Sequence, residues 1–159
     1  MTTESHAVST AVFMLDDAIG SALPRLRKSL REEQLSIAAE INVTHRVKLT
    51  LDINVPDCRI MLIDSPAFML ETTAIDRTSG IFIPMHLVVS AAGNRTLVYM
   101  LNLEHIRHSD LPIGIRAPVM DLQRQILRAL AKVGQRVRGM QDPLDRQENT
   151  CAALDRSPI

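Results

Sequence analysis

The chain contains few aromatic residues: three Phe, one Tyr and no Trp among 159 residues. Proteins that hold single-stranded nucleic acid without sequence preference stack the bases on aromatic side chains, and this chain has almost none to offer. The formal net charge is zero, so no bulk electrostatic attraction to nucleic acid or to an anionic membrane is expected. Neither nucleic acid nor a membrane is therefore predicted as a partner.

Cysteine is also scarce. Cys58 and Cys151 lie far apart and without a CxxC spacing, which argues against a zinc site and against a disulfide framework. No apolar run approaches the length of a membrane-spanning helix. The N-terminal stretch "MTTESHAVSTAVFML" lacks a basic region followed by a long apolar run, so no secretory signal is predicted. A cytoplasmic protein is the simplest interpretation.

Common catalytic motifs are missing as well: GxSxG, a Walker loop, GxGxxG and HExxH do not occur. Serine and cysteine nucleophiles have no evident partner in the sequence. Glu40 is the best lone carboxylate, and surface exposure is its expected state. The sequence leans against an enzyme without excluding one, and it specifies no cofactor.

Apolar residues make up 46% and charged residues 23% of the chain, which is typical of one globular domain with a substantial core. Eight Met residues partly replace aromatics as adaptable core filler. We expect a flexible N-terminus at 1–7, a single domain at 8–138 and a flexible C-terminal tail at 139–159.

Hydrophobic periodicity predicts a mixture of strands and helices. Leu23, Leu26 and Leu30 fall on one face of a helix over roughly 21–34. Alternating or continuous apolar runs predict strands at 8–15, 35–43, 58–65, 81–91 and 96–103, the last two as a hairpin. Further helices are predicted from Pro66 onward and over 118–138, with a polar loop at 104–117. This order predicts an α+β fold, with helices packed on one face of a mainly antiparallel sheet.

Residues 44–55 are ambiguous. Val47, Leu49, Leu51, Ile53 and Val55 alternate with polar residues, which favours a strand. Thr44 could equally cap a short helix that uses Val47 and Leu51. From the pattern alone, strand is preferred.

Several segments resemble the bacterial family called domain of unknown function 302. These are "LREEQLSIAAEINV", "CRIMLIDSP", "AIDRTSGIFIPMHLVV" and "TLVYMLNL". Asp64-Ser65-Pro66, Asp76, Gly80 and Ile83-Pro84 stand at the places of the family's short motifs. The resemblance covers most of residues 20–138. It implies a small α+β fold, often dimeric, with no established general activity, and it implies a helix at 44–53.

The chain also departs from the family pattern. Gln34 replaces the glycine that is usual at the end of the first helix. Met85 and Ile63-Asp64 occupy places where many relatives carry cysteine, so thiol chemistry at those points is not expected here. Pro84 belongs to a family motif and is expected to mark a bulge or a strand edge.

The family motifs concentrate around Pro66 and Pro84, so we expect a ligand pocket between the sheet and the helices near both segments. The predicted ligand-binding residues are Asp64, Ser65, Pro66, Met69, Phe82, Pro84, Met85 and His86. Methionines would give an adaptable lining. Simple capping of a helix by Ser65 or Asp64 is the alternative for that turn. The first hypothesis is thus a homodimeric domain that binds a small molecule without catalysis.

A haem- or metal-binding redox protein is the second hypothesis. Met85 and His86 lie on opposite faces of a regular strand, so they cannot share one metal unless a bulge re-aims one. Core packing for Met85 and a hydrogen-bonded or half-exposed state for His86 are the simpler expectations. His105 and His108, beside Glu104 and Asp110, are weak candidates in a loop. No metal site is assigned.

A structural or regulatory interaction protein is the third hypothesis. A basic stripe recurs every four residues along the last predicted helix, at Arg124, Arg128, Lys132 and Arg136. A second basic cluster comprises Arg25, Arg27, Lys28 and Arg31. A solvent-exposed face whose cations pair with carboxylates is the simpler interpretation of both.

Overall fold

The computed structural model describes residues 10–103 and 114–137. The elements, in chain order, are β1 (Thr10–Leu15), α1 (Ile19–Glu32), β2 (Ser36–Asn42), α2 (Val43–Leu51), β3 (Cys58–Asp64), α3 (Pro66–Ile75), a 3₁₀ turn η1 (Arg77–Ile81), β4 (Met85–Ala92), β5 (Arg95–Leu101), α4 (Arg116–Val133) and β6 (Gln135–Val137). The predicted domain limits, at residues 7–8 and 138–139, lie outside the described ranges and stay predictions.

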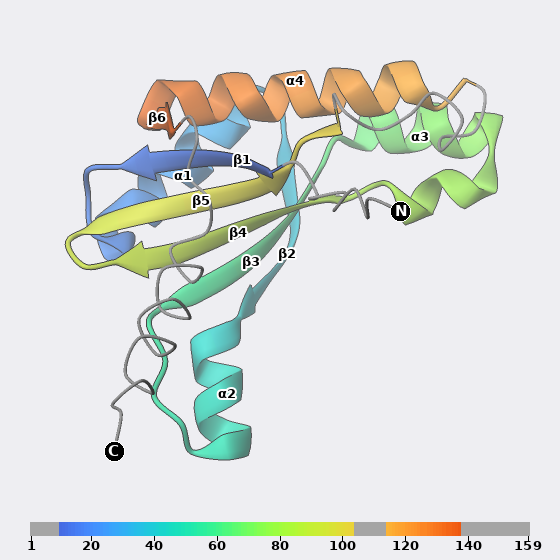
Figure 1. Ribbon diagram of the computed structural model, residues 1–159. Coiled ribbons are helices and arrows are strands. Elements are labelled where there is room, and N and C mark those ends of the chain that lie inside the picture. The colour runs from blue at the N-terminus through green and yellow to red at the C-terminus, as the bar shows by residue number, and fades with distance from the viewer. Residues whose placement is uncertain (1–9, 104–113, 138–159) are drawn as a thin grey trace, which may run out of the picture.

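The strands form one six-stranded sheet in the order β2-β3-β4-β5-β1-β6. Every neighbouring pair in this sheet runs antiparallel. Figure 1 shows α1 and α4 together on one face of the sheet, while α2 extends beyond the end of β2 and β3. The predicted α+β fold, with a mainly antiparallel sheet and helices on one face, is confirmed. No helix in the two described ranges is both long and apolar enough to cross a membrane.

The core lies between the sheet and the two long helices. Leu26 and Leu30 of α1 and Leu122 and Ile126 of α4 are fully buried. With the buried Leu23 and Val119 they recur at spacings of three and four, so each helix presents one apolar face. Inward residues of the strands complete the core, among them Phe13, Met61, Leu87 and Val98. The chain thus buries one face of the sheet and leaves the other without a helix in the described part.

The backbone conformation at the end of α1 explains why glycine is usual there in the family, although this chain has Gln34. Gln34 adopts φ 61°, in the left-handed region that glycine enters without steric cost. The backbone N–H of Leu35 donates to the carbonyl of Leu30 at 3.0 Å, which closes the helix end. Gln34 therefore takes the conformation for which a glycine is suited, at a steric cost that glycine avoids.

Residues 44–55 contain a helix, so the strand that alternation favoured is wrong and the helix implied by the family is confirmed. The side chain of Asn42 accepts a hydrogen bond from the backbone N–H of His45 at 2.9 Å and caps α2. Leu49 and Leu51 remain 73% and 62% exposed. The alternation did not predict a strand correctly because these side chains are not buried against a sheet face. The Asn42 cap stabilises the helix instead.

Two further boundaries differ from the prediction. Residues 81–84 precede β4 rather than belonging to it, because η1 runs to Ile81 and β4 begins at Met85. The last helix ends at Val133, and residues 135–137 reverse to pair with β1. A Cβ on Gly134 would lie 2.7 Å from the carbonyl oxygen of Met14, so only glycine permits this close approach.

Ion pairs tie the end of α1 to α4. Glu33, the residue after α1, accepts from Lys132 at 2.7 Å and from Arg128 at 3.1 Å. Hydrogen bonds from Lys132 and then Arg128 lower the pKa of the Glu33 carboxyl below its usual value. A lowered folded-state pKa means that this contribution to stability is present above the unfolded pKa and is lost as the pH falls through the folded pKa.

We therefore expect Glu33→Gln to destabilise the protein at neutral pH and to have little effect well below pH 4, roughly the ordinary range of a glutamate. Urea denaturation of both proteins across this pH range measures the difference. Glu71→Gln on exposed α3 is the matched control and should leave stability unchanged. A Glu33→Gln effect of the same size at every pH would contradict the assignment.

Candidate functional site

A cavity of about 390 Å³ opens at the start of β4 and the end of β5. Four of the predicted ligand-binding residues line it: Phe82, Pro84, Met85 and His86. It differs from the expected position between sheet and helices, because most of its strand residues belong to the sheet face that carries no described helix. We call it the outer-face cavity.

The alternation along β4 decides which side chains reach this cavity. Met85 is 5% exposed and joins the core on the helix side. His86 is exposed and Val88 is half-buried, both on the outer face. Val88 pairs with Tyr99 of β5, which places the phenol ring beside it on that face. The prediction that Met85 and His86 point to opposite faces is confirmed.

Pro84 lies directly before the first residue of β4, after a cis peptide bond with Ile83. A proline is tolerated there because the strand ladder has not begun and needs no N–H from it. The register irregularity of the sheet occurs elsewhere, in β2 between Ile37 and Ala39. The expected bulge at Pro84 is therefore wrong, and the strand-edge alternative matches its position.

The segment around Pro66 lies next to the segment around Pro84, because Ile63 of β3 pairs with Met85 of β4. Asp64 and Ser65 are nevertheless buried. The Ser36 hydroxyl donates to the Asp64 carboxylate, and α3 begins at Pro66 without a side-chain cap from Ser65. Met69 packs against the core. Asp64, Ser65, Pro66 and Met69 thus do not line the outer-face cavity.

The cavity also contains residues that sequence reasoning missed, among them Thr10, Val88, Tyr99, Leu101 and Leu103. Alternation in "TLVYMLNL" places Tyr99 and Leu101 on one strand face, and pairing the predicted hairpin would have put that face beside His86. Ile81 and Leu101 form an apolar rim, 79% and 42% exposed. The lining is therefore mainly apolar, with an imidazole, a phenol and a hydroxyl as its polar side chains.

The described residues offer no arrangement of side chains that would bind a metal ion or a haem iron. Met85 is buried on the face opposite His86, so the two cannot bind one metal. Within residues 10–103 and 114–137, no three His, Cys, Asp or Glu side chains gather in a way that could hold a metal ion. His105 and His108, together with the central part of the predicted loop, lie outside the described residues.

The basic stripe of the last helix is largely neutralised. Arg128 and Lys132 pair with Glu33, and Arg124 pairs with Asp121 on the same helix. Arg136 belongs to β6 rather than to the helix, so the predicted four-residue repeat is interrupted at Gly134. The second cluster behaves alike, since Arg25 pairs with Asp17, Arg27 with Glu40 and Lys28 with Glu32.

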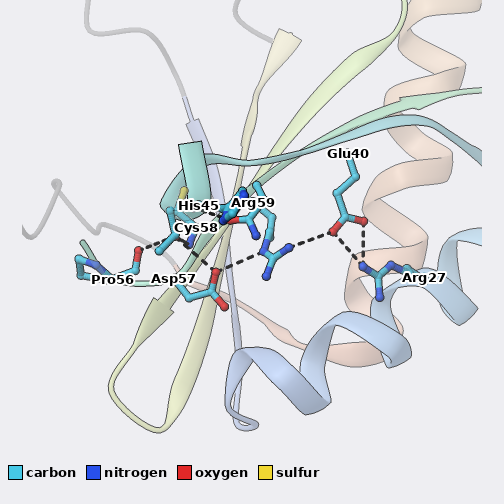
Figure 2. A network of polar contacts seen from close by, with 9 residues as sticks. Arg27, Glu40, His45, Pro56, Asp57, Cys58 and Arg59 are labelled. Atoms are coloured by element: carbon cyan, nitrogen blue, oxygen red, sulfur yellow. Dashed lines mark hydrogen bonds and ion pairs between the residues drawn. The ribbon is translucent and has the colours of Figure 1, made fainter. Parts of the chain in front are cut away.

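Glu40 is exposed, as the sequence indicated, but it has cationic partners. It pairs across the sheet with the buried Met61, so it lies on the helix side. Figure 2 shows its carboxylate between two guanidinium groups. Arg27 of α1 donates to both of its oxygens at 2.9 and 2.8 Å, and Arg59 lies 3.9 Å away. The register shift in β2 turned Glu40 toward α1.

Cys58 begins β3 beside this network. Its partial burial, assisted by the negative charge of Asp57, raises the pKa of the thiol. A raised pKa leaves less of the reactive thiolate near neutral pH. Its backbone N–H donates to the Thr44 hydroxyl at 2.8 Å, which joins the start of β3 to the first turn of α2.

Comparison with known proteins identifies relatives by sequence and by fold. The sequence model of the family described as "Domain of unknown function DUF302" matches residues 13–133. No match was found among curated proteins. The crystal structure of an uncharacterized conserved protein DUF302 from Bacillus stearothermophilus is similar, with a TM-score of 0.71 at 16% identity. The match covers 80% of this chain and 99% of that one, and at this identity it supports the fold alone.

The opposite orientations of Met85 and His86 give a direct test of the site geometry. Met85→Asp should destabilise the protein by at least about 3 kcal/mol, because it buries a charge without a partner. His86→Asp, one residue along the same strand, should change stability by no more than about 0.5 kcal/mol. Urea denaturation measures both, and equal effects of the two substitutions would mean that β4 does not present these faces.

Proposed function

Because the chain belongs to the family described as domain of unknown function DUF302, whose description names no activity, we propose a function from the site itself: a domain that binds a small, mainly apolar molecule in the outer-face cavity. The observation that carries this proposal is the cavity of about 390 Å³ at Phe82, Pro84, Met85 and His86. Its volume falls within the range typical of small-molecule sites, about 300–1,000 Å³.

The lining supports a ligand of particular character. Phe82, Val88, Met100 and Leu101 provide apolar surface, and the methionines can adapt to irregular shapes. The His86 imidazole is exposed at the cavity and can donate or accept a hydrogen bond. The proposed ligand is therefore an apolar body with one polar group directed at His86.

Binding is favoured over catalysis by the polar groups that the cavity offers. Its described lining residues include no carboxylate, amine or thiol, so His86 has no described partner there that would orient it as a general base. The lining offers the hydroxyls of Thr10 and Tyr99, but a hydroxyl is a weak nucleophile unless an oriented base activates it. We propose a non-catalytic role on this basis.

We further propose that the protein is a bacterial, cytoplasmic homodimer. The bacterial source of the structural neighbour supports a bacterial origin. The two widely spaced cysteines support a reducing compartment such as the cytoplasm. For the dimer, the support is the outer sheet face. Ile41 and Ile60 pair on it across β2 and β3, both half-buried, and Ile60 pairs with Val88 of the cavity lining. A second copy seated there would cover the cavity.

Filling the cavity tests the ligand site. Val88→Trp should weaken binding of the fluorescent probe 1-anilinonaphthalene-8-sulfonate at least about tenfold, because the indole occupies the space that the probe needs. Ile41→Trp, on the same sheet face but outside the cavity lining, should leave the affinity unchanged. Fluorescence titration of the full chain measures it, with circular dichroism as the check on folding. Unchanged binding by a folded Val88→Trp protein would refute the site.

The homodimer is tested separately. Light scattering after size exclusion should give twice the mass of the 17.7 kDa chain. Ile60→Lys should shift the protein toward the monomer, because a charge on the outer face would lose its hydration in the interface. Leu49→Lys on exposed α2 is the matched control and should leave the dimer intact. A monomeric wild-type protein, or equal dissociation by both variants, would rule out this interface.

A further inference from the structure

A second cavity, of about 430 Å³, lies between α2, the segment that follows it and the start of β3. Its polar lining consists mainly of Asn42, His45, Lys48, Asn54, Asp57 and Arg59. It is separate from the outer-face cavity, because the two cavities share no lining residue. We call it the α2 cavity.

Hydrogen bonds hold the walls of the α2 cavity in place. The Thr44 hydroxyl donates to the carbonyl of Pro56 at 3.1 Å and accepts from the N–H of Cys58 at 2.8 Å. These bonds fasten the first turn of α2 to the start of β3. The backbone N–H of Ala91 donates to the carbonyl of Asp57 at 2.7 Å, which anchors the same segment to β4. The cavity is thus preorganised by backbone contacts.

Arg59 brings a positioned guanidinium to this cavity. Its Nε donates to Asp57 at 3.2 Å, and its Nη1 lies 3.9 Å from Glu40. Both carboxylate oxygens of Glu40 already accept a hydrogen bond from Arg27, as Figure 2 shows. Among the described residues, the two Nη groups of Arg59 make no hydrogen bond, and the side chain is 26% exposed. The guanidinium therefore has Nη donors left for a ligand, since its contact with Glu40 is an ion pair at 3.9 Å and not a hydrogen bond.

Two further donors, His45 and Lys48, come from α2, and the residue that caps this helix, Asn42, lies three positions before His45. All three residues line the cavity. Lys48 pairs with Asp52 at 2.6 Å, but Asp52 is 90% exposed, so a ligand can replace that solvated pair at little cost. The single acid of the lining, Asp57, is engaged by Arg59. The lining itself holds two cations, Lys48 and Arg59, and one acid, Asp57, while Asp52 and Glu40 pair with the two cations from outside the lining.

We propose that the α2 cavity binds the phosphate group of a small phosphorylated molecule. A phosphate has several strong acceptor oxygens, and a planar guanidinium matches two of them at once. Arg59 and Lys48 would supply the charge-assisted hydrogen bonds, with the His45 ring and the asparagine amides completing the set. The volume exceeds that of a bare ion, and Ile53 and Val55 offer apolar contact to the remainder of the molecule.

Nuclear magnetic resonance titration of the full chain with inorganic phosphate tests this proposal. We expect saturable shifts confined to the amides of the lining residues, and weaker binding by about tenfold in Arg59→Gln, which removes a charged donor. Lys48→Gln should weaken binding similarly and keeps the fold intact, because its only described partner is the exposed Asp52. Arg46→Gln, an exposed cation on the same helix outside the lining, should bind as the wild type.

Three results would overturn the proposal. One is the absence of saturable shifts at the lining residues. Another is an equal loss of affinity in Arg46→Gln, which would indicate general charge screening. The third is acetate binding as tightly as phosphate, which would replace the phosphate assignment by a nonspecific anion site. The two cavities are tested with different probes and different variants, so neither result depends on the other.

Discussion

Burial of one face of the antiparallel sheet under α1 and α4 is the constraint on which the rest of the structure depends. Leu26 and Leu30 from one helix and Ile126 and Leu130 from the other are completely buried. Because side chains alternate along a strand, this one-sided burial fixes the direction of every residue in β4 and β5. Met85 enters the core for that reason, and His86 and Tyr99 are left on the face where the outer-face cavity opens.

The sequence predicted those elements correctly in which a long apolar pattern corresponds to side chains that are buried in the core. The leucine spacing of α1, the continuous run of β3 and the β4–β5 hairpin all satisfy this condition. Residues 43–51 do not, because none of their side chains is buried, so a single asparagine cap outweighed the alternation. The short strand β6 was not predicted, because three residues are too few to show an alternating pattern. Its position depends on a contact between distant residues, the close approach of Gly134 to the backbone of Met14.

The candidate site was predictable only where it coincides with a motif. Pro84, Met85 and His86 were predicted from the family motif around Pro84, and they line the cavity. Asp64 and Ser65 were predicted from the motif around Pro66, and they are buried. The difference does not lie in the sheet face, because Leu62, two residues before Asp64, pairs with His86. Asp64 instead accepts a hydrogen bond from Ser36 of the neighbouring strand β2, a contact that depends on the pairing of two strands. A register shift in β2, which moved Glu40 toward α1 and into contact with Arg27, is likewise a property of two strands together.

The placement of β1 within the sheet has a consequence for the order in which the chain can assemble. Its two neighbours are β5, at residues 95–101, and β6, at residues 135–137, so its first pairing partner emerges about eighty residues after it during synthesis. Until then the apolar side chains of the strand "TAVFML" lack their native neighbours. Closing so long a loop delays the non-local pairing. The sheet can therefore be completed only after β5 and β6 have been synthesised, so the earlier β2–β3 pairing can form before β1 finds its place.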